Sequence, residues 1–192
     1  TDKTGNTSSS TSRLFTILMD GTPPTKVQTV NDSLTADIDF SSSTVQLSAN
    51  WSTATDTESG VSRYWYAIGT SAGDTSVRSW TDNGTATYMT ASGLSLTNGI
   101  KYYISVKAEN GSGVTSAYTS SDGVTIDSIA PSEVSNLTAT GSDGRIDLSW
   151  SNPSAADFAG TAIVRKTGGY PANVGDGTLI YNASGTTHAD TG

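Results

Sequence analysis

Cysteine is absent from the 192 residues of this chain, which excludes disulfide bonds, thiolate metal sites and cysteine nucleophiles. Histidine occurs once, as His188, and methionine occurs twice. No apolar run approaches the roughly 20 residues that a membrane-spanning helix needs, so we expect no membrane span in this segment. No long helical pattern is visible either, and short strands are the expected elements.

Positive charge is also scarce. Lysine and arginine total 10 against 18 aspartates and glutamates, which gives a formal net charge of −8. A nucleic-acid partner is excluded, because phosphate binding requires a basic surface. Hydrophobic residues make up 34% of the chain, which is low for one compact globule but sufficient for thin two-layer sandwiches. Serine, threonine, glycine, asparagine and aspartate dominate the remainder and suit turns and exposed strand faces.

A repeated linker pattern divides the chain. An apolar strand, an aspartate, a few small or apolar residues and a proline occur at 15–24 and again at 123–131. Asp20 and Asp127 are 107 residues apart, which is about the length of one β-sandwich domain. Proline lacks a backbone donor and so ends one strand ladder before the next begins. The linkers delimit three expected segments: 1–20, 21–129 and 130–192.

Short alternating segments between the linkers predict strands separated by turns. The expected ranges are 26–30, 45–51, 62–68, 76–81, 86–91, 101–108 and 123–126. Alternate residues point to opposite faces of a strand, so each strand divides into an inner and an outer set. The residues expected in the core are Val45, Leu47, Ala49, Trp51, Tyr64, Tyr66, Ile68, Leu96, Tyr102, Ile104, Val106 and Ala108.

A leucine, a turn and a tyrosine follow one another at Leu96-Thr97-Asn98-Gly99-Ile100-Lys101-Tyr102. This pattern is similar to the tyrosine corner of sandwich domains, in which the tyrosine hydroxyl bonds to backbone upstream. The chain resembles bacterial extracellular fibronectin type III-like domains. In the middle segment the resemblance rests on Trp51, Ser59-Gly60-Val61, Tyr64, 66–70, 94–98 and Tyr102. In the last segment it rests on Pro131, Val134, Leu137, Ile146, Leu148, Trp150, 157–160 and 163–171.

This resemblance implies an all-β fold of tandem fibronectin type III-like, immunoglobulin-like β-sandwiches, one complete and two partial. Residues 1–20 would be the C-terminal strand or strands of a preceding sandwich, 21–129 a complete sandwich, and 130–192 the N-terminal part of a further one. The last segment would hold strands A, B, C, C′ and E. We expect either that the natural chain continues and supplies strands F and G, or that a strand such as 13–18 from a neighbouring molecule completes the sheet.

Catalytic chemistry is not expected. His188 stands alone, and the carboxylates occur singly in turns. No cofactor is expected, with Ca²⁺ as the open alternative. Asp32, Asp37 and Asp39 lie within eight residues and offer oxygen ligands of the kind that Ca²⁺ takes. The competing interpretation, which we favour, is that these carboxylates cap turns by bonding to nearby backbone.

Three aromatic residues are candidates for surface contacts. Trp65 and Tyr103 point outward on neighbouring strands, and Trp80 lies close to a turn beside them. Outward rings can stack on sugars or pack against another module or subunit. They can equally shield the sheet or clamp the stem of Lys107.

The sequence therefore predicts a non-catalytic structural, spacer or adhesive segment of a large extracellular multi-domain surface or filament protein. Its partners would be neighbouring domains or subunits, and its location extracellular or at the cell surface. The alternative is a carbohydrate-binding accessory module of a secreted polysaccharide-degrading enzyme, with polysaccharide as the partner.

Overall fold

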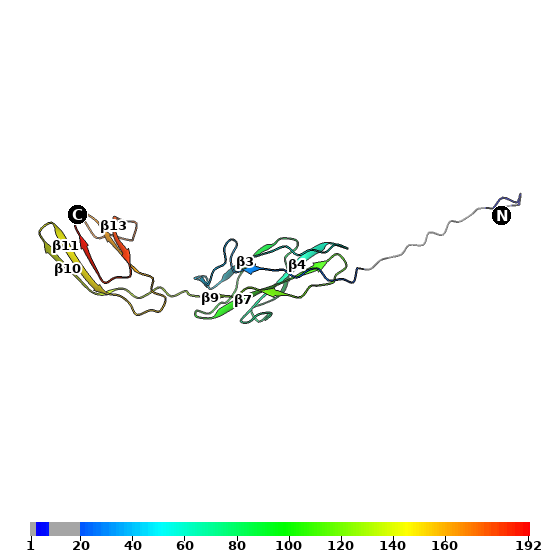
Figure 1. The fold of residues 1–192 in the computed structure, drawn as a ribbon, viewed down its shortest axis with the longest axis horizontal. Coiled ribbons are helices and arrows are strands. Elements are labelled where there is room, and N and C mark those ends of the chain that lie inside the picture. Colours follow the sequence, from blue (N-terminus) through cyan, green and yellow to red (C-terminus); the bar gives the residue numbers. More distant parts are fainter. Residues whose placement is uncertain (1–2, 8–19) are drawn as a thin grey trace. The chain divides into compact units, whose positions relative to one another are not determined.

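The computed structural model describes residues 3–7 and 20–192, and every regular element in these ranges is a β-strand. The chain divides into two compact units, of which the first ends at Ser128 and the second spans Ile129–Gly192 (Figure 1). The strand of a preceding sandwich expected at 1–20 falls mainly on residues outside these described ranges. No helix of the described part of the chain is long and apolar enough to cross a membrane.

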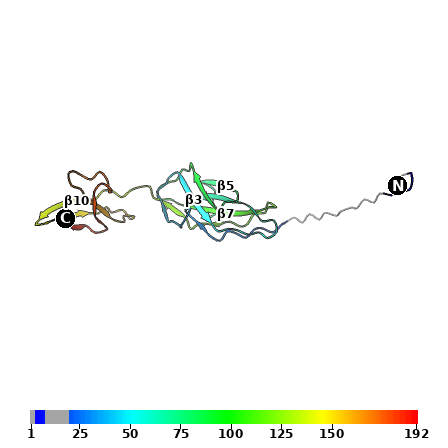
Figure 2. The same ribbon diagram turned by 90° about the horizontal axis from the view of Figure 1, so that it is seen from above.

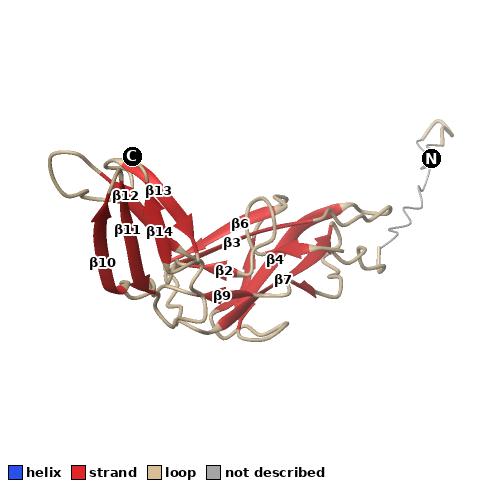
Figure 3. Cartoon of the chain, turned by 60° about the vertical axis from the view of Figure 1, so that its left-hand side comes forward, coloured by secondary structure: helices blue, strands red, loops and turns tan. Residues whose placement is uncertain are grey.

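The first unit is a two-layer sandwich. Its strands are Val30–Asn31 (β1), Phe40–Ser41 (β2), Gln46–Trp51 (β3), Val61–Gly69 (β4), Arg78–Asp82 (β5), Tyr88–Ser92 (β6), Lys101–Asn110 (β7), Thr119–Ser120 (β8) and Val124–Ile126 (β9). One sheet has the order β1-β3-β6 and the other the order β2-β9-β7-β4-β5, with β8 also on β7. Figure 2 shows β3 lying across β5 and β7, and Figure 3 shows β3 beside β6.

Two irregularities interrupt this sandwich. The chain pairs with β3 through β1 and then crosses to the other sheet, where β2 runs parallel to β9. The second irregularity separates β8 from β9. Ser120 pairs with Ser105, and Val124 pairs with Tyr102. The segment from β8 to β9 therefore advances four residues, from 120 to 124, while β7 advances three, from 105 to 102. The extra residue makes a bulge at 121–123, and bulges redirect side chains.

The core lies between the two sheets and follows the predicted alternation. Trp51, Tyr64 and Leu96 are buried, and the inner residues of β7 are no more than 4% exposed. The Thr97 amide donates to the Tyr102 hydroxyl at 2.9 Å, which confirms the predicted tyrosine corner. The prediction for Val45 is wrong, since its side chain is 58% exposed. Strand β3 begins one residue later, and the Ser43 hydroxyl accepts from the Val45 and Gln46 amides instead.

The second unit has two smaller sheets. Its strands are Ser135–Ser142 (β10), Arg145–Ser151 (β11), Thr161–Arg165 (β12), Thr178–Ala183 (β13) and Thr187–Asp190 (β14). The first sheet has the order β10-β11-β14, and the second pairs β12 with β13. Trp150 is buried and meets the Tyr181 ring edge-on at 5.2 Å. Ile146, Leu137 and Leu179 stay between 45% and 62% exposed.

Candidate functional site

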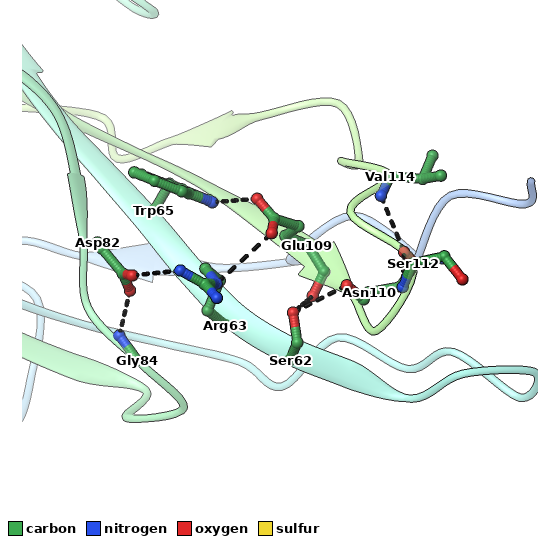
Figure 4. Close-up of polar contacts among 9 residues, drawn as sticks. All are labelled: Ser62, Arg63, Trp65, Asp82, Gly84, Glu109, Asn110, Ser112 and Val114. Carbon is green, nitrogen blue, oxygen red and sulfur yellow. Dashed lines mark hydrogen bonds and ion pairs between the residues drawn. The ribbon is translucent and has the colours of Figure 1, made fainter. Parts of the chain in front are cut away.

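The outer face of β4, β5 and β7 carries the aromatic residues that the sequence singles out. Trp65 is opposite Lys107 on β7 and Asp82 on β5. Its indole Nε1 donates to Glu109 at 2.7 Å, and Arg63 lies 2.6 Å from Asp82 and 3.5 Å from Glu109 (Figure 4). Alternation places all these residues on the face away from the core. Their polar groups are therefore joined in one network on the sheet itself.

Each of the three candidate aromatic rings has a cation over one face. Arg63 lies 5.9 Å from the Trp65 ring centre, Lys101 lies 5.8 Å from that of Tyr103, and Lys107 lies 4.6 Å from that of Trp80. Cations in this position are attracted by the ring's electron-rich face. The Trp80 ring also lies beside the Tyr118 ring, with 6.4 Å between the two ring centres. Because all three residues are partly buried, the arrangement favours shielding of the sheet over an open platform for sugar stacking.

Loops cover the middle of this outer face. Ser105 and Ala67 point away from the core, yet both are 0% exposed. The Ser105 hydroxyl accepts from the Gly73 amide at 2.9 Å and contacts the Ser120 hydroxyl at 2.8 Å. The loop between β4 and β5 therefore folds over this face, while β8 lies beside β7 in the same sheet. Asp74 organises that loop, and the Ser76 hydroxyl, followed by the Thr70 amide, lowers its pKa to about 2.

A second group of candidate residues forms an acidic cluster at the two irregularities of the sandwich. One carboxylate oxygen each from Asp32, Asp37 and Asp122 lies within 4.8 Å of the others. Asp32 and Asp37 come from the crossover between β1 and β2, and Asp122 comes from the bulge between β8 and β9. Asp39, the third residue expected from the sequence, is not one of these three. Its backbone carbonyl instead accepts from the Thr125 amide at 2.8 Å.

Asp32 is the buried member of this acidic cluster. Its side chain is 2% exposed, and its Oδ2 accepts from the Gly123 amide at 3.0 Å. Burial raises the pKa of the Asp32 carboxyl to about 6, against the Ser121 hydroxyl, which lowers it. The Asp37 carboxylate adds to the increase. Asp37 and Asp122 are exposed, so the cluster opens to solvent on one side.

The incoming chain is fixed to the first unit through Asp20. The Asp20 carboxylate accepts from the Thr22 amide at 2.9 Å and from the Asn110 side-chain amide at 2.7 Å. The Ser59 hydroxyl also donates to Asp20, and this contact is the main cause of its lowered pKa. The side chain of Asn110, which is only 1% exposed, also donates to the Thr22 carbonyl at 2.9 Å.

Asn110 holds more than the incoming chain. Its Oδ1 accepts from the Ser112 and Val114 amides at 3.1 and 2.9 Å, which closes the turn after β7 (Figure 4). Its backbone carbonyl accepts from the Ser62 hydroxyl at 2.8 Å. The Asn110 side chain therefore connects the incoming chain to the turn that follows β7.

The outgoing chain is fixed at the other end of β7. Ser128 donates through its amide to Asn98 Oδ1 at 2.7 Å, and its hydroxyl approaches the same oxygen at 3.1 Å. The Asp127 amide donates to the Ser41 carbonyl at 2.9 Å. Asn98 precedes β7, whereas Asn110 ends it, and a ten-residue strand spans about 30 Å. We call the contacts of Asn110 and Asn98 the two end anchors.

The single histidine lies within the second unit. The centre of its ring lies 5.3 Å from that of Tyr181, and His188 is paired with Leu148 on β11. This places it on the same sheet face as Trp150. Nearby, the Arg165 guanidinium lies 2.7 Å from the Asp190 carboxylate, whose side chain is 9% exposed.

Sequence reasoning missed Asp122, Asn98 and Asn110 as parts of these sites. Asn98 and Asn110 each precede a glycine, a pattern that indicates only a turn. Asp122 lies in a Ser-Ser-Asp-Gly run, which is an equally ordinary turn signal. A side-chain role appears only when the strands bring these turns against other segments.

Two layers with these strand orders and a tyrosine corner define a fibronectin type III-like β-sandwich. Among solved structures, the chain is similar to the FN1–FN3 domains of chicken CNTN1. The TM-score is 0.50 at 16% identity, and the match covers 89% of this chain and 58% of that one. The chain thus spans less than two thirds of the matched structure, and the likeness concerns the fold. No family model and no curated protein matches the chain.

Proposed function

We propose that this chain is a non-catalytic segment of an extracellular or cell-surface multi-domain protein, and that its first unit acts as a load-bearing spacer. The observation that carries the proposal is the pair of end anchors. At each end of the unit, an asparagine side chain close to one end of β7 is hydrogen-bonded to a linker residue. Asn110 binds Asp20 in the incoming chain, and Asn98 binds Ser128 in the outgoing chain. Tension on the chain would then enter and leave through the folded body.

The end anchors lie in series with the longest strand of the unit. Between them run β7 and its ladders to β4 and β9. The anchors sit at opposite ends of this strand, so a pulling force loads its flanking hydrogen bonds together. Composition agrees with this role, since an acidic, hydroxyl-rich surface keeps such units soluble.

Single-molecule pulling tests the proposal. Cysteines introduced by Thr7→Cys and Ser132→Cys provide unique attachment points, because the chain has no other cysteine. We expect Asn110→Ala and Asn98→Ala to lower the unfolding force of the first unit. The matched control is Ile104→Val, a core change that costs about 0.5–1.5 kcal/mol without touching an anchor.

The anchor variants should lower the force more than the core control does at equal loss of equilibrium stability. Forces that follow equilibrium stability alone, whichever residue is changed, would contradict the load-bearing role. The carbohydrate-binding alternative makes a different prediction. It requires polysaccharide to retard the chain in affinity electrophoresis and Trp65→Ala to abolish the retardation.

A further inference from the structure

One oxygen of a buried carboxylate lacks a partner. Asp32 Oδ1 is shielded from solvent and has no hydrogen-bond partner among the described residues, although Oδ2 of the same group is bonded to Gly123. A buried polar atom without a partner costs free energy and calls for an explanation such as an ion. Asp32 follows directly after β1, so its position is fixed by the sandwich.

Negative charge collects around the Asp32 carboxylate without compensation. Asp37 and Asp122 each bring a carboxylate oxygen within 4.8 Å of the Asp32 ligand atom. Within 3–7 and 20–192, none of the three carboxylates forms an ion pair with lysine, arginine or histidine. Like charges at this separation repel, and a bound cation would reverse the sign of the interaction.

Turn capping explains only part of the arrangement. Asp37 Oδ1 accepts from the Asp32 amide at 2.8 Å, which is ordinary capping within a turn. It leaves Asp32 Oδ1 unsatisfied, and it gives no reason for Asp122 to approach from a different strand. The crossover is also held independently, since the Asn50 side-chain amide donates to the Ser33 and Thr35 carbonyls at 2.8 and 2.9 Å.

We propose that Asp32, Asp37 and Asp122 bind one Ca²⁺ ion. All three offer hard oxygen ligands, which suit Ca²⁺ and Mg²⁺ and not softer metals. Calcium–oxygen distances of about 2.4 Å allow two ligand atoms of one ion to lie up to about 4.8 Å apart, and Ca²⁺ accepts irregular geometry, whereas Mg²⁺ demands a near-ideal octahedron. Because two of the carboxylates are exposed, water completes the coordination.

The ion would join two segments that are far apart in the sequence. It would tie the crossover between β1 and β2 to the bulge between β8 and β9, which are the first and last parts of the sandwich. Gly123, whose amide binds Asp32, has a φ of 94°, a backbone conformation that residues with a side chain rarely adopt. The inference does not depend on the load-bearing role.

The test is titration of the EDTA-treated whole chain with CaCl₂ by calorimetry, followed by thermal unfolding in EDTA and in CaCl₂. We expect saturable binding of one ion and a higher Tm in CaCl₂. Asp122→Asn should weaken binding at least tenfold. Asp39→Asn is the matched control, since it removes the same charge from the crossover but lies outside the cluster, and it should leave the affinity within about twofold.

Asp32→Asn separates a ligand from a merely structural carboxylate. The amide can still accept from Gly123 and no longer buries a charge, so we expect a higher Tm in EDTA together with loss of the response to CaCl₂. Absence of CaCl₂ binding to the unmodified chain would overturn the proposal. Equal loss of affinity in Asp39→Asn and Asp122→Asn, or a stronger response to MgCl₂ than to CaCl₂, would overturn the assignment of the site.

Discussion

The two units contain the same kinds of strand but bury different amounts of apolar surface. Strands β10, β11, β14, β12 and β13 correspond in order and pairing to β1, β3, β6, β4 and β5. The first unit additionally has β7 and β9, whose inner residues include Ile104, Val106 and Val124, all fully buried. In the second unit Trp150 is buried, but Ile146 remains 45% exposed.

This comparison shows which part of the sandwich creates the core. In both units the first strands form one sheet of the sandwich and contribute a buried tryptophan, Trp51 or Trp150. In the first unit, β7 and β9 cover the inner face of this sheet and bury apolar residues that would otherwise be exposed. Each Å² of apolar surface removed from water stabilises the fold by about 25 cal/mol. We therefore expect the core residues of the first unit to be more sensitive to substitution than those of the second.

The matched tryptophans give the largest expected difference. Trp51→Ala should destabilise the first unit by about 3–5 kcal/mol, because it removes a buried ring that meets Tyr64 edge-on. Trp150→Ala should cost the second unit less, about 1–3 kcal/mol, since fewer buried groups surround it. Urea unfolding followed by a probe in each unit measures both losses. Equal losses would break the comparison.

Removal of the tyrosine-corner bond gives the next largest effect. Tyr102→Phe leaves the Thr97 amide without its partner and should destabilise the first unit by about 1–2 kcal/mol. Tyr103→Phe on the outer face of the same strand is the control and should stay within about 0.5 kcal/mol. The midpoints of urea unfolding at an unchanged m-value would show the difference. A Tyr102→Phe variant as stable as the unmodified chain would contradict a stabilising role for the corner bond.

Two arginine–aspartate pairs test burial in smaller steps. Arg165→Met should cost the second unit about 1–2 kcal/mol, because it leaves the nearly buried Asp190 unpaired. Arg63→Met should cost the first unit no more than about 1 kcal/mol, since Arg63 and Asp82 are each about 40% exposed. Thermal unfolding of both variants decides the order, and a larger loss for Arg63→Met would reverse it.

The smallest effects concern acid pH. Hydrogen bonds from the Ser76 hydroxyl and the Thr70 amide lower the pKa of Asp74 to about 2, below its ordinary value of 3.8. A carboxyl with a lowered pKa contributes stability that is present above pH 3.8 and is lost as the pH falls toward 2. Lys166 lowers the pKa of Asp176 in the second unit in the same direction. Carboxyl NMR titration should place both midpoints below 3.8, and unshifted midpoints would contradict these contacts.

Local patterns predicted much of the fold because they report which face of a strand is buried. The inner residues of β7 and the corner at Tyr102 follow from alternation and from a short turn motif. Val45 did not follow, because alternation cannot tell where pairing with β6 begins. Ser105 is outward as expected but buried, since loops remote in sequence close over it.

The sites were less predictable, because their residues meet only through tertiary pairing. Asp32 and Asp37 lie five positions apart in the sequence, but Asp122 joins them through the one-residue bulge between β8 and β9. Asn110 and Asp20 are separated by 90 positions and form their bond only when the sandwich closes. Trp65 and Trp80 are partly buried on the outer face, and the cations over their rings depend on residues of neighbouring strands, which a local pattern does not report.

The end anchors are the centre of this account, and backbone dynamics test them most directly. Order parameters from ¹⁵N relaxation report whether linker residues move with the sandwich on the picosecond–nanosecond scale. We predict values near 0.85, like those of β7, at Thr22 and Ser128 in the unmodified chain. Asn110→Ala should release Thr22 alone, and Asn98→Ala should release Ser128 alone. Values below about 0.6 at both residues of the unmodified chain would contradict the anchored spacer.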